Sequence, residues 1–161
     1  MSLQVGDKAP QFTLKSKNLS GDVKDISLTD FTGKNLVILF YPQSFTGVCT
    51  NEMCVVSDGL NEYTDIGSDV IAISVDSVFT QEAWSKVNNI KIPLLSDFNR
   101  KVIELYGTKY SDGGFVHDMN GVSKRAAFVI DKTGIVRYAE ILESAGDLPD
   151  FDAIKDTLKS L

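Results

Sequence analysis

The sequence predicts an α/β fold in which a mixed central sheet is flanked by helices. Short apolar runs rich in β-branched residues alternate with amphipathic stretches, and turn residues join the last two runs. Crossovers through helices imply parallel neighbouring strands, whereas a tight turn implies an antiparallel pair. The chain has 161 residues with no internal repeat and no linker-like segment, so residues 1–161 are expected to form a single domain.

Five apolar runs are expected to be strands, four of them strongly patterned and one weaker. In chain order they are Leu36–Tyr41, Val70–Val75, Ile92–Leu95 (the weaker run), Ala126–Ile130 and Ile135–Ile141. The last two are separated by Asp131–Gly134, whose residue types are those of a tight turn. These two strands are therefore expected to form a hairpin.

Four amphipathic stretches are expected to be helices. The longest begins after Pro42 and ends at Gly67, a natural C-cap. The second follows the candidate N-caps Ser77 and Thr80, the third is short, and the last begins at Asp150. The apolar positions expected on the four buried faces are Val48, Met53, Val56, Leu60 and Tyr63; Phe79, Ala83, Trp84 and Val87; Val102, Leu105 and Tyr106; and Phe151, Ile154, Leu158 and Leu161.

The charge balance argues against polyanionic partners. There are 16 basic and 22 acidic side chains, for a net charge of −6, whereas nucleic acids and anionic membranes require a basic surface. No apolar run approaches the ~20 residues of a membrane-spanning helix, and the first residues do not resemble a secretory signal. We expect no nucleic-acid or membrane partner and a cytoplasmic location, where two cysteines are more often catalytic, metal-binding or buried than disulfide-bonded.

The segment from Tyr41 to Cys54 joins a predicted strand to a predicted helix, the place where α/β folds bind ligands. Cys49 is expected in the first helical turn, where free backbone N–H groups and the helix dipole favour the thiolate. A thiolate can attack a peroxide oxygen and become a sulfenic acid. Thr46 can aim its hydroxyl at the peroxide, and Pro42 suits a rigid wall beside the sulfur.

The pattern Pro42-x-x-x-Thr46-x-x-Cys49 resembles the active-site motif of the peroxiredoxins. The run from Phe45 to Cys54 is similar to the branch that includes bacterioferritin comigratory protein and its plant relative, PrxQ. Further matching features follow in the same order along most of the chain: Gly6-Asp7-x-Ala9-Pro10-x-Phe12, Ile73–Asp76, Leu95–Asp97 and Lys124–Asp131. The resemblance implies a thioredoxin-like fold with an N-terminal extension. It also implies a thiol-dependent peroxidase that reduces hydrogen peroxide and organic hydroperoxides and is recycled by a dithiol such as thioredoxin.

Two further roles are implied by the resemblance. Arg125 precedes a predicted strand, where the family's arginine holds the thiolate and polarises the peroxide; the alternative is a surface ion pair. Cys54 would be the resolving cysteine; the alternative is a small core residue. On one helix, residues five apart are about 7.5 Å apart along the axis, so a disulfide between Cys49 and Cys54 requires local unwinding. Thr46 could simply cap the helix, and Glu52 is interpreted as a first-turn acid that stabilises the helix dipole.

Three other protein classes are disfavoured. A cysteine protease needs a histidine, but His117 lies in the long, glycine-containing connection Thr108–Asn120 and the flanking protease signatures are missing. A thioredoxin-like disulfide reductase needs Cys-x-x-Cys, and a non-enzymatic binding module has no use for the combined motif. The spacing of the two cysteines and the histidine does not suit zinc, so no metal and no cofactor are expected. A monomer or homodimer is expected, with Phe45 or Phe79 as candidate interface residues.

Overall fold

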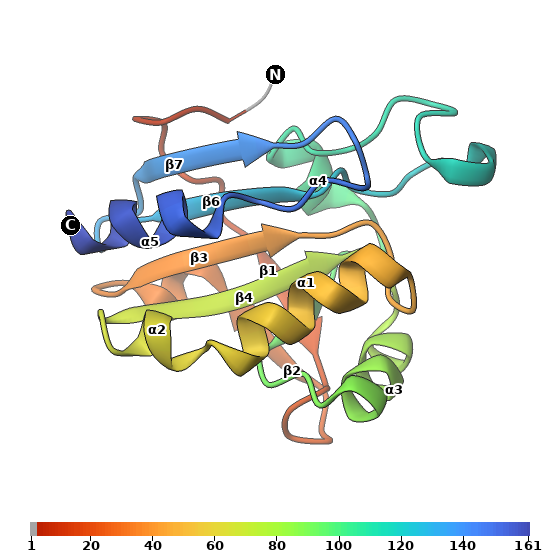
Figure 1. Ribbon diagram of the computed structural model, residues 1–161, viewed down its shortest axis with the longest axis horizontal. Coiled ribbons are helices and arrows are strands. Elements are labelled where there is room, and N and C mark those ends of the chain that lie inside the picture. The colour runs from red at the N-terminus through yellow and green to blue at the C-terminus, as the bar shows by residue number, and fades with distance from the viewer. Residues whose placement is uncertain (1–2) are drawn as a thin grey trace.

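A mixed sheet lies at the centre of the computed structural model, which describes residues 3–161 (Figure 1). Within these residues the sheet is seven-stranded, in the spatial order β2-β1-β5-β4-β3-β6-β7. The strands are β1 (Thr13–Ser16), β2 (Lys24–Ser27), β3 (Asn35–Phe40), β4 (Ser68–Ser74), β5 (Leu94–Ser96), β6 (Ala126–Ile130) and β7 (Val136–Ile141). The neighbours β3, β4 and β5 are parallel, and the other neighbouring pairs are antiparallel. The predicted mixed sheet and its terminal hairpin are confirmed.

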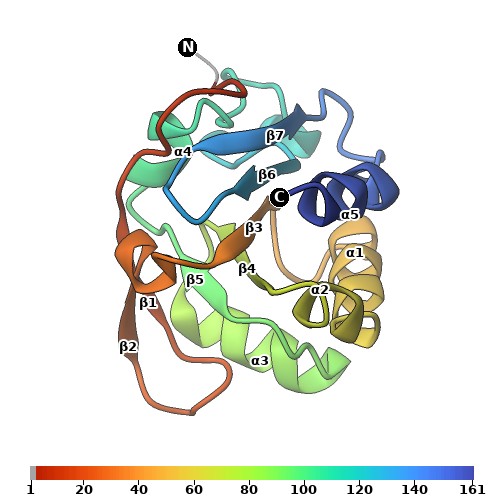
Figure 2. The same cartoon turned by 90° about the vertical axis from the view of Figure 1, so that its left-hand side faces the viewer.

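Helices cover both faces of the sheet (Figure 2). They are α1 (Gly47–Asp58), α2 (Asn61–Thr64), α3 (Val78–Asn88), α4 (Lys101–Leu105) and α5 (Phe151–Lys159), with short 3-10 helices at Leu28–Phe31 and Val116–Asp118. The even-numbered side chains of β3 join a core with α4 and the N-terminal segment, while Val37 and Leu39 join a second core with α1, α3 and α5. Because both faces are buried, β3 is apolar from Leu36 to Phe40. None of the helices within residues 3–161 is long and apolar enough to cross a membrane.

The five predicted strands lie within two residues of their expected bounds. The hairpin of β1 and β2, which forms the other edge of the sheet, was not predicted from the pattern. Each of its strands has four residues, most of them exposed or half-buried, so neither contains an apolar run. Short polar strands of this kind are typical of sheet edges.

The prediction of one helix from Pro42 to Gly67 is wrong. The helix α1 ends at Asp58, and a separate short helix, α2, follows it. Gly59 caps α1, and glycine is unfavourable by about 1 kcal/mol inside a helix. Ser57, in the last turn, accepts a hydrogen bond from the backbone N–H of Lys91, which anchors the end of α1 beside the chain that follows α3.

Several side chains expected on buried helix faces are exposed instead: Phe79, Ala83, Val87, Leu105 and Leu161. In α3 the buried face carries Trp84 together with two polar residues, Gln81 and Ser85. Gln81 donates to the carbonyl oxygen of Leu95, and Ser85 donates to that of Ile90. The buried face is therefore chosen partly by hydrogen bonds to the neighbouring backbone, which an apolar pattern does not reveal.

Candidate active site

The antiparallel pairing of β3 and β6 brings Cys49 and Arg125 together. Phe40, the last residue of β3, lies opposite Ala126, the first residue of β6. The loop after β3 leads into α1, and Arg125 directly precedes β6, so Cys49 and Arg125 meet although 76 residues separate them.

Cys49 and Arg125 form a buried pair at the head of α1. Each is only 1% exposed, and both terminal nitrogens of Arg125 donate to the Cys49 sulfur, at 3.3 Å each. The same two nitrogens donate to Glu52 Oε1 at 2.8 Å and to the carbonyl oxygen of Ala145 at 3.0 Å. Four contacts therefore fix the plane of the guanidinium against the sulfur, as a buried charge requires.

Glu52 belongs to this cluster, and the prediction of a simple first-turn acid is wrong. It is fully buried and forms an ion pair with Arg125. Burial raises the pKa of Glu52 to about 7, although the charge of Arg125 and its hydrogen bond oppose the rise. Burial also opposes the charge of Arg125, but Glu52 and Cys49 together raise its pKa. A signal was present in the sequence: Glu52 is three residues after Cys49, so both lie on the same side of the helix.

A cavity of about 250 Å³ opens beside the Cys49 sulfur. It is lined by Pro42, Thr46, Gly47, Val48, Cys49, Phe115, Val116, Arg125, Ala145 and Gly146. Four of the residues singled out in the sequence therefore meet there. Thr46 is the N-cap residue of α1, but its side chain makes no capping bond; its hydroxyl instead donates to the carbonyl oxygen of Gln43 at 2.8 Å.

The loop between β3 and α1 is strained and firmly anchored. Phe45 has a φ of 67°, a region that residues other than glycine rarely adopt. Next to it, the backbone N–H and the hydroxyl of Ser44 both donate to Asp76 Oδ2 at 2.9 Å, and the hydroxyl of Ser74 donates to the same oxygen at 2.7 Å. The end of β4 thus holds the loop in the shape that places Thr46 and Cys49 in the cavity.

Cys54 does not line the cavity. It lies on the same continuous helix as Cys49, is half-buried, and its thiol donates to the carbonyl oxygen of Asn88 at 3.8 Å. Both cysteines are free thiols. One turn before Cys54, the hydroxyl of Thr50 accepts a hydrogen bond from Trp84 Nε1 at 3.0 Å. Two hydrogen bonds therefore join the middle of α1 to α3.

His117 is exposed and does not line the cavity either, although Val116 beside it does. Within residues 3–161 no group of three or more metal-ligating side chains is found.

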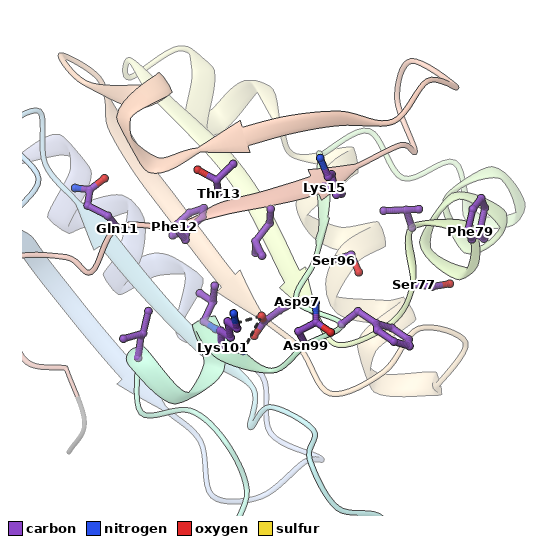
Figure 3. Close-up of a pocket in the computed structure, with 15 residues that line it drawn as sticks. Gln11, Phe12, Thr13, Lys15, Ser77, Phe79, Ser96, Asp97, Asn99 and Lys101 are labelled. Atoms are coloured by element: carbon purple, nitrogen blue, oxygen red, sulfur yellow. Dashed lines mark hydrogen bonds between the residues drawn. The ribbon is translucent and has the colours of Figure 1, made fainter.

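A larger cavity, of about 660 Å³, lies between β1, the start of α3 and the loop from β5 to α4 (Figure 3). Its wall is largely apolar and includes the exposed side chains of Phe79, Phe98 and Leu105. Its buried carboxylate, Asp97, accepts hydrogen bonds from the backbone N–H groups of residues 101–103 and so caps α4. No thiol lines this cavity, so the chemistry points to the smaller one.

Comparisons with known proteins show which family and which relatives the chain is similar to. The family model for the AhpC/TSA family matches residues 5–139. A peroxiredoxin of Cynops pyrrhogaster is 37% identical over 163 residues, which cover 97% of this chain and 76% of the relative. A thioredoxin peroxidase of Echinococcus granulosus is 33% identical over 168 residues, covering 100% of this chain and 81% of the relative.

Solved structures extend the likeness to the fold. The crystal structure of the peroxidoxin BcpB from Mycobacterium tuberculosis has a TM-score of 0.83 and 28% identity, covering 99% of this chain and 98% of that one. A reduced 2-Cys peroxiredoxin from Plasmodium vivax has a TM-score of 0.85 and 29% identity, covering 96% and 79%. The expected thioredoxin-like fold is thereby confirmed.

Proposed function

This chain belongs to the AhpC/TSA family of peroxiredoxins, and from that premise we propose that it reduces hydrogen peroxide and organic hydroperoxides with Cys49 as its nucleophile. The observation that carries this assignment is the buried sulfur of Cys49, held 3.3 Å from both terminal nitrogens of Arg125. A guanidinium stays charged at all relevant pH values, so it can stabilise a thiolate even where water is excluded.

The reaction follows from the residues around the cavity. The thiolate of Cys49 attacks one peroxide oxygen, the S–O bond forms as the O–O bond breaks, and the second oxygen leaves with the bonding electron pair and takes up a proton. Negative charge therefore builds on the leaving oxygen. Arg125 and the first backbone N–H groups of α1, which have no acceptor inside the helix, are the donors that can stabilise it. The products are a Cys49 sulfenic acid and water or an alcohol.

The Thr46 hydroxyl is proposed to accept a hydrogen bond from the substrate rather than to donate one. The hydroxyl already donates a hydrogen bond to the carbonyl oxygen of Gln43, so its oxygen can accept one from the O–H group of a bound peroxide. Such a bond would orient the substrate, while Pro42 forms part of the cavity wall without offering a competing N–H group.

Cys54 is proposed as the resolving cysteine, which would attack the sulfenic acid and release water as the disulfide forms. The two cysteines lie in one continuous helix, so this step requires α1 to unwind. It also requires the loss of the hydrogen bonds from Cys54 to Asn88 and from Trp84 to Thr50. The branch of bacterioferritin comigratory protein and PrxQ remains our assignment, and the similarity to BcpB supports it.

A thioredoxin-like dithiol is proposed as the reductant that opens the disulfide. The name of the relative from Echinococcus granulosus, thioredoxin peroxidase, supports this choice. Dithiol reductants of this kind keep thiols reduced in the cytoplasm, which is the location we propose. For the assembly we propose a monomer or a homodimer, with the exposed rings of Phe45 and Phe79 as candidate contacts.

Two cysteine variants test the proposed function. Cys49→Ser should lose peroxide turnover by a factor on the order of a thousand or more, because no other thiol faces Arg125. Cys54→Ser should consume the first equivalent of peroxide at a near-normal rate and then accumulate as sulfenic acid. Single-turnover thiol loss and intact mass measure both. Substantial turnover by Cys49→Ser, with its circular dichroism unchanged, would refute the assignment.

A further inference from the structure

Asp76, which follows the end of β4, is the centre of a network of polar side chains beside the loop from β3 to α1. Its Oδ2 atom accepts three hydrogen bonds: two from the backbone N–H and the hydroxyl of Ser44, at 2.9 Å each, and one from the hydroxyl of Ser74, at 2.7 Å. Asp76 does not line the cavity beside Cys49, so it does not contact a peroxide bound there. It is nevertheless bonded to the loop that carries Thr46 into that cavity.

Three hydrogen bonds fix Ser44 in this network. A carboxylate only accepts hydrogen bonds, so the Ser44 hydroxyl donates to Asp76, and its oxygen is left to accept from the hydroxyl of Tyr41 at 3.2 Å. Burial is the main cause that raises the pKa of Tyr41, so this hydroxyl keeps its proton. Both the backbone and the side chain of Ser44, which is buried, are therefore held in place.

Asp76 is in turn anchored to the sheet and to α3. The hydroxyl of Ser96, at the end of β5, donates to the carbonyl oxygen of Asp76 at 2.6 Å. The N–H of Asp76 donates to Ser74 Oγ at 3.3 Å, and Gln81, fully buried in α3, donates to the same oxygen at 3.1 Å. The loop is thus tied through Asp76 to two strands and a helix, and such elements position a site more precisely than a loop does.

The N–H of Ser44 and the carbonyl of Gln43 belong to one peptide group, which is planar. That N–H donates to Asp76, while the carbonyl oxygen accepts the hydrogen bond from the Thr46 hydroxyl at 2.8 Å. Asp76 and Thr46 therefore bind the two ends of one rigid unit. Phe45, with its φ of 67°, follows directly, and strain of this kind persists only where the surroundings enforce it. Without Asp76 the peptide group would be free to rotate and to turn the Thr46 hydroxyl with it.

We propose that Asp76 is a positioning residue for peroxide reduction, which holds the peptide group between Gln43 and Ser44 so that the Thr46 oxygen faces the bound peroxide. This inference rests on the proposed function and gives a role to a residue that does not touch the substrate. A misplacement of about 1 Å, caused at a distance from the reacting atoms, can slow a reaction by about a hundredfold. Loss of the Asp76 carboxylate should therefore slow the oxidation of Cys49 by about tenfold to a hundredfold.

The test measures second-order rate constants for oxidation of the Cys49 thiol by hydrogen peroxide in a single turnover, so that the reductant plays no part. Asp76→Ala should show the full loss of rate. Asp76→Asn should slow the reaction by only about fivefold, because its amide oxygen still accepts from the Ser44 N–H, although a neutral acceptor binds it more weakly. In a Thr46→Val background, which has no hydroxyl to orient, both Asp76 variants should cause little further loss. A general destabilisation of the loop would instead add to the effect of Thr46→Val.

The matched control is Asp131→Ala. Asp131 also accepts three hydrogen bonds on one carboxylate oxygen, two from Thr133 and one from Ile135, but it lies in the turn between β6 and β7 and does not line the cavity beside Cys49. This variant should lose stability in chemical denaturation, as Asp76→Ala does, but its rate constant should equal that of the wild-type protein.

The inference is overturned if Asp76→Ala reacts as fast as Asp131→Ala, or if it costs as much in the Thr46→Val background as in the wild-type protein. If Asp76→Ala does not fold, the rates of Asp76→Asn in the same two backgrounds decide between these outcomes. All of them leave the peroxidase assignment intact, whereas failure of the wild-type protein to react with hydrogen peroxide would refute the proposed function itself.

Discussion

The two cysteines of α1 place the same side chain in two opposite settings. Cys49, in the first turn, is almost completely buried yet faces two cationic N–H donors. Cys54, farther along the helix, is more exposed, but its thiol donates a hydrogen bond to the backbone carbonyl oxygen of Asn88. Donors favour the thiolate and an acceptor favours the thiol. The comparison teaches that the neighbouring hydrogen-bonding groups, and not exposure alone, distinguish the two sulfurs, and this distinction is the basis for proposing Cys49 as the nucleophile.

Removal of the Arg125 side chain should leave the Cys49 sulfur, like that of Cys54, without a cationic donor. In Arg125→Ala, oxidation of Cys49 by peroxide should slow by a factor on the order of a hundred, since donors to both the thiolate and the leaving oxygen are lost. Stopped-flow rate constants for the reduced protein measure the change. Arg137→Ala is the control, because Arg137 pairs with Asp131 on the surface and should leave the rate unchanged. An unaltered rate in Arg125→Ala would mean that the pair is structural.

Glu52, the other partner of Arg125, should make the stability of the protein depend on pH. Glu52 has a pKa raised from 4.5 to about 7, so the folded protein binds more protons than the unfolded chain between these values. Stability from this group is complete below pH 4.5 and is lost as the pH rises towards 7, by on the order of 1–3 kcal/mol. Glu52→Gln should remove this decline from the denaturation profile. The control Glu143→Gln, at an exposed carboxylate, should retain the decline in stability. Equal denaturation profiles for the wild-type protein and Glu52→Gln would exclude the raised pKa of Glu52.

The smallest effect concerns the helix that separates the two sulfurs. Thr50→Val removes the acceptor of the Trp84 hydrogen bond, which is one of the contacts that must break before α1 unwinds. The loss of about 0.5–1.5 kcal/mol should speed disulfide formation about twofold to tenfold once the sulfenic acid is present. Quenched-flow mass spectrometry follows the disulfide, and the rate of sulfenic acid formation serves as the internal control. A slower or unchanged second step would show that the limiting barrier lies elsewhere.

The sequence predicted what depends on local pattern. The apolar run from Leu36 to Tyr41 predicted a strand and the turn residues Asp131–Gly134 predicted a hairpin, and the structure contains both. The pairing of Cys49 with Arg125 was expected from the family resemblance, and the antiparallel register of β3 and β6 supplies its physical basis.

What the sequence did not reveal depends on contacts between distant segments. From the sequence Glu52 could be interpreted as an ordinary helix acid, and only the contact with Arg125, which directly precedes β6, makes its burial tolerable. Val116 lies in a connection without periodic pattern, so nothing in its local sequence indicated that it lines the same cavity as Cys49. Gly59 ends α1 early because helix continuation depends on balances of about 1 kcal/mol, below what an apolar pattern resolves.

The distance of 76 residues between the sulfur and its cation bears on the order in which the protein is made. Synthesis proceeds from the N-terminus, so Cys49 leaves the ribosome well before Arg125 exists, and β6 must still insert beside β3 before the two can meet. Until then the nascent chain carries Cys49 without the guanidinium that contacts its sulfur in the folded protein. If Cys49 is the nucleophile as proposed, its reactivity would therefore depend on completion of the sheet.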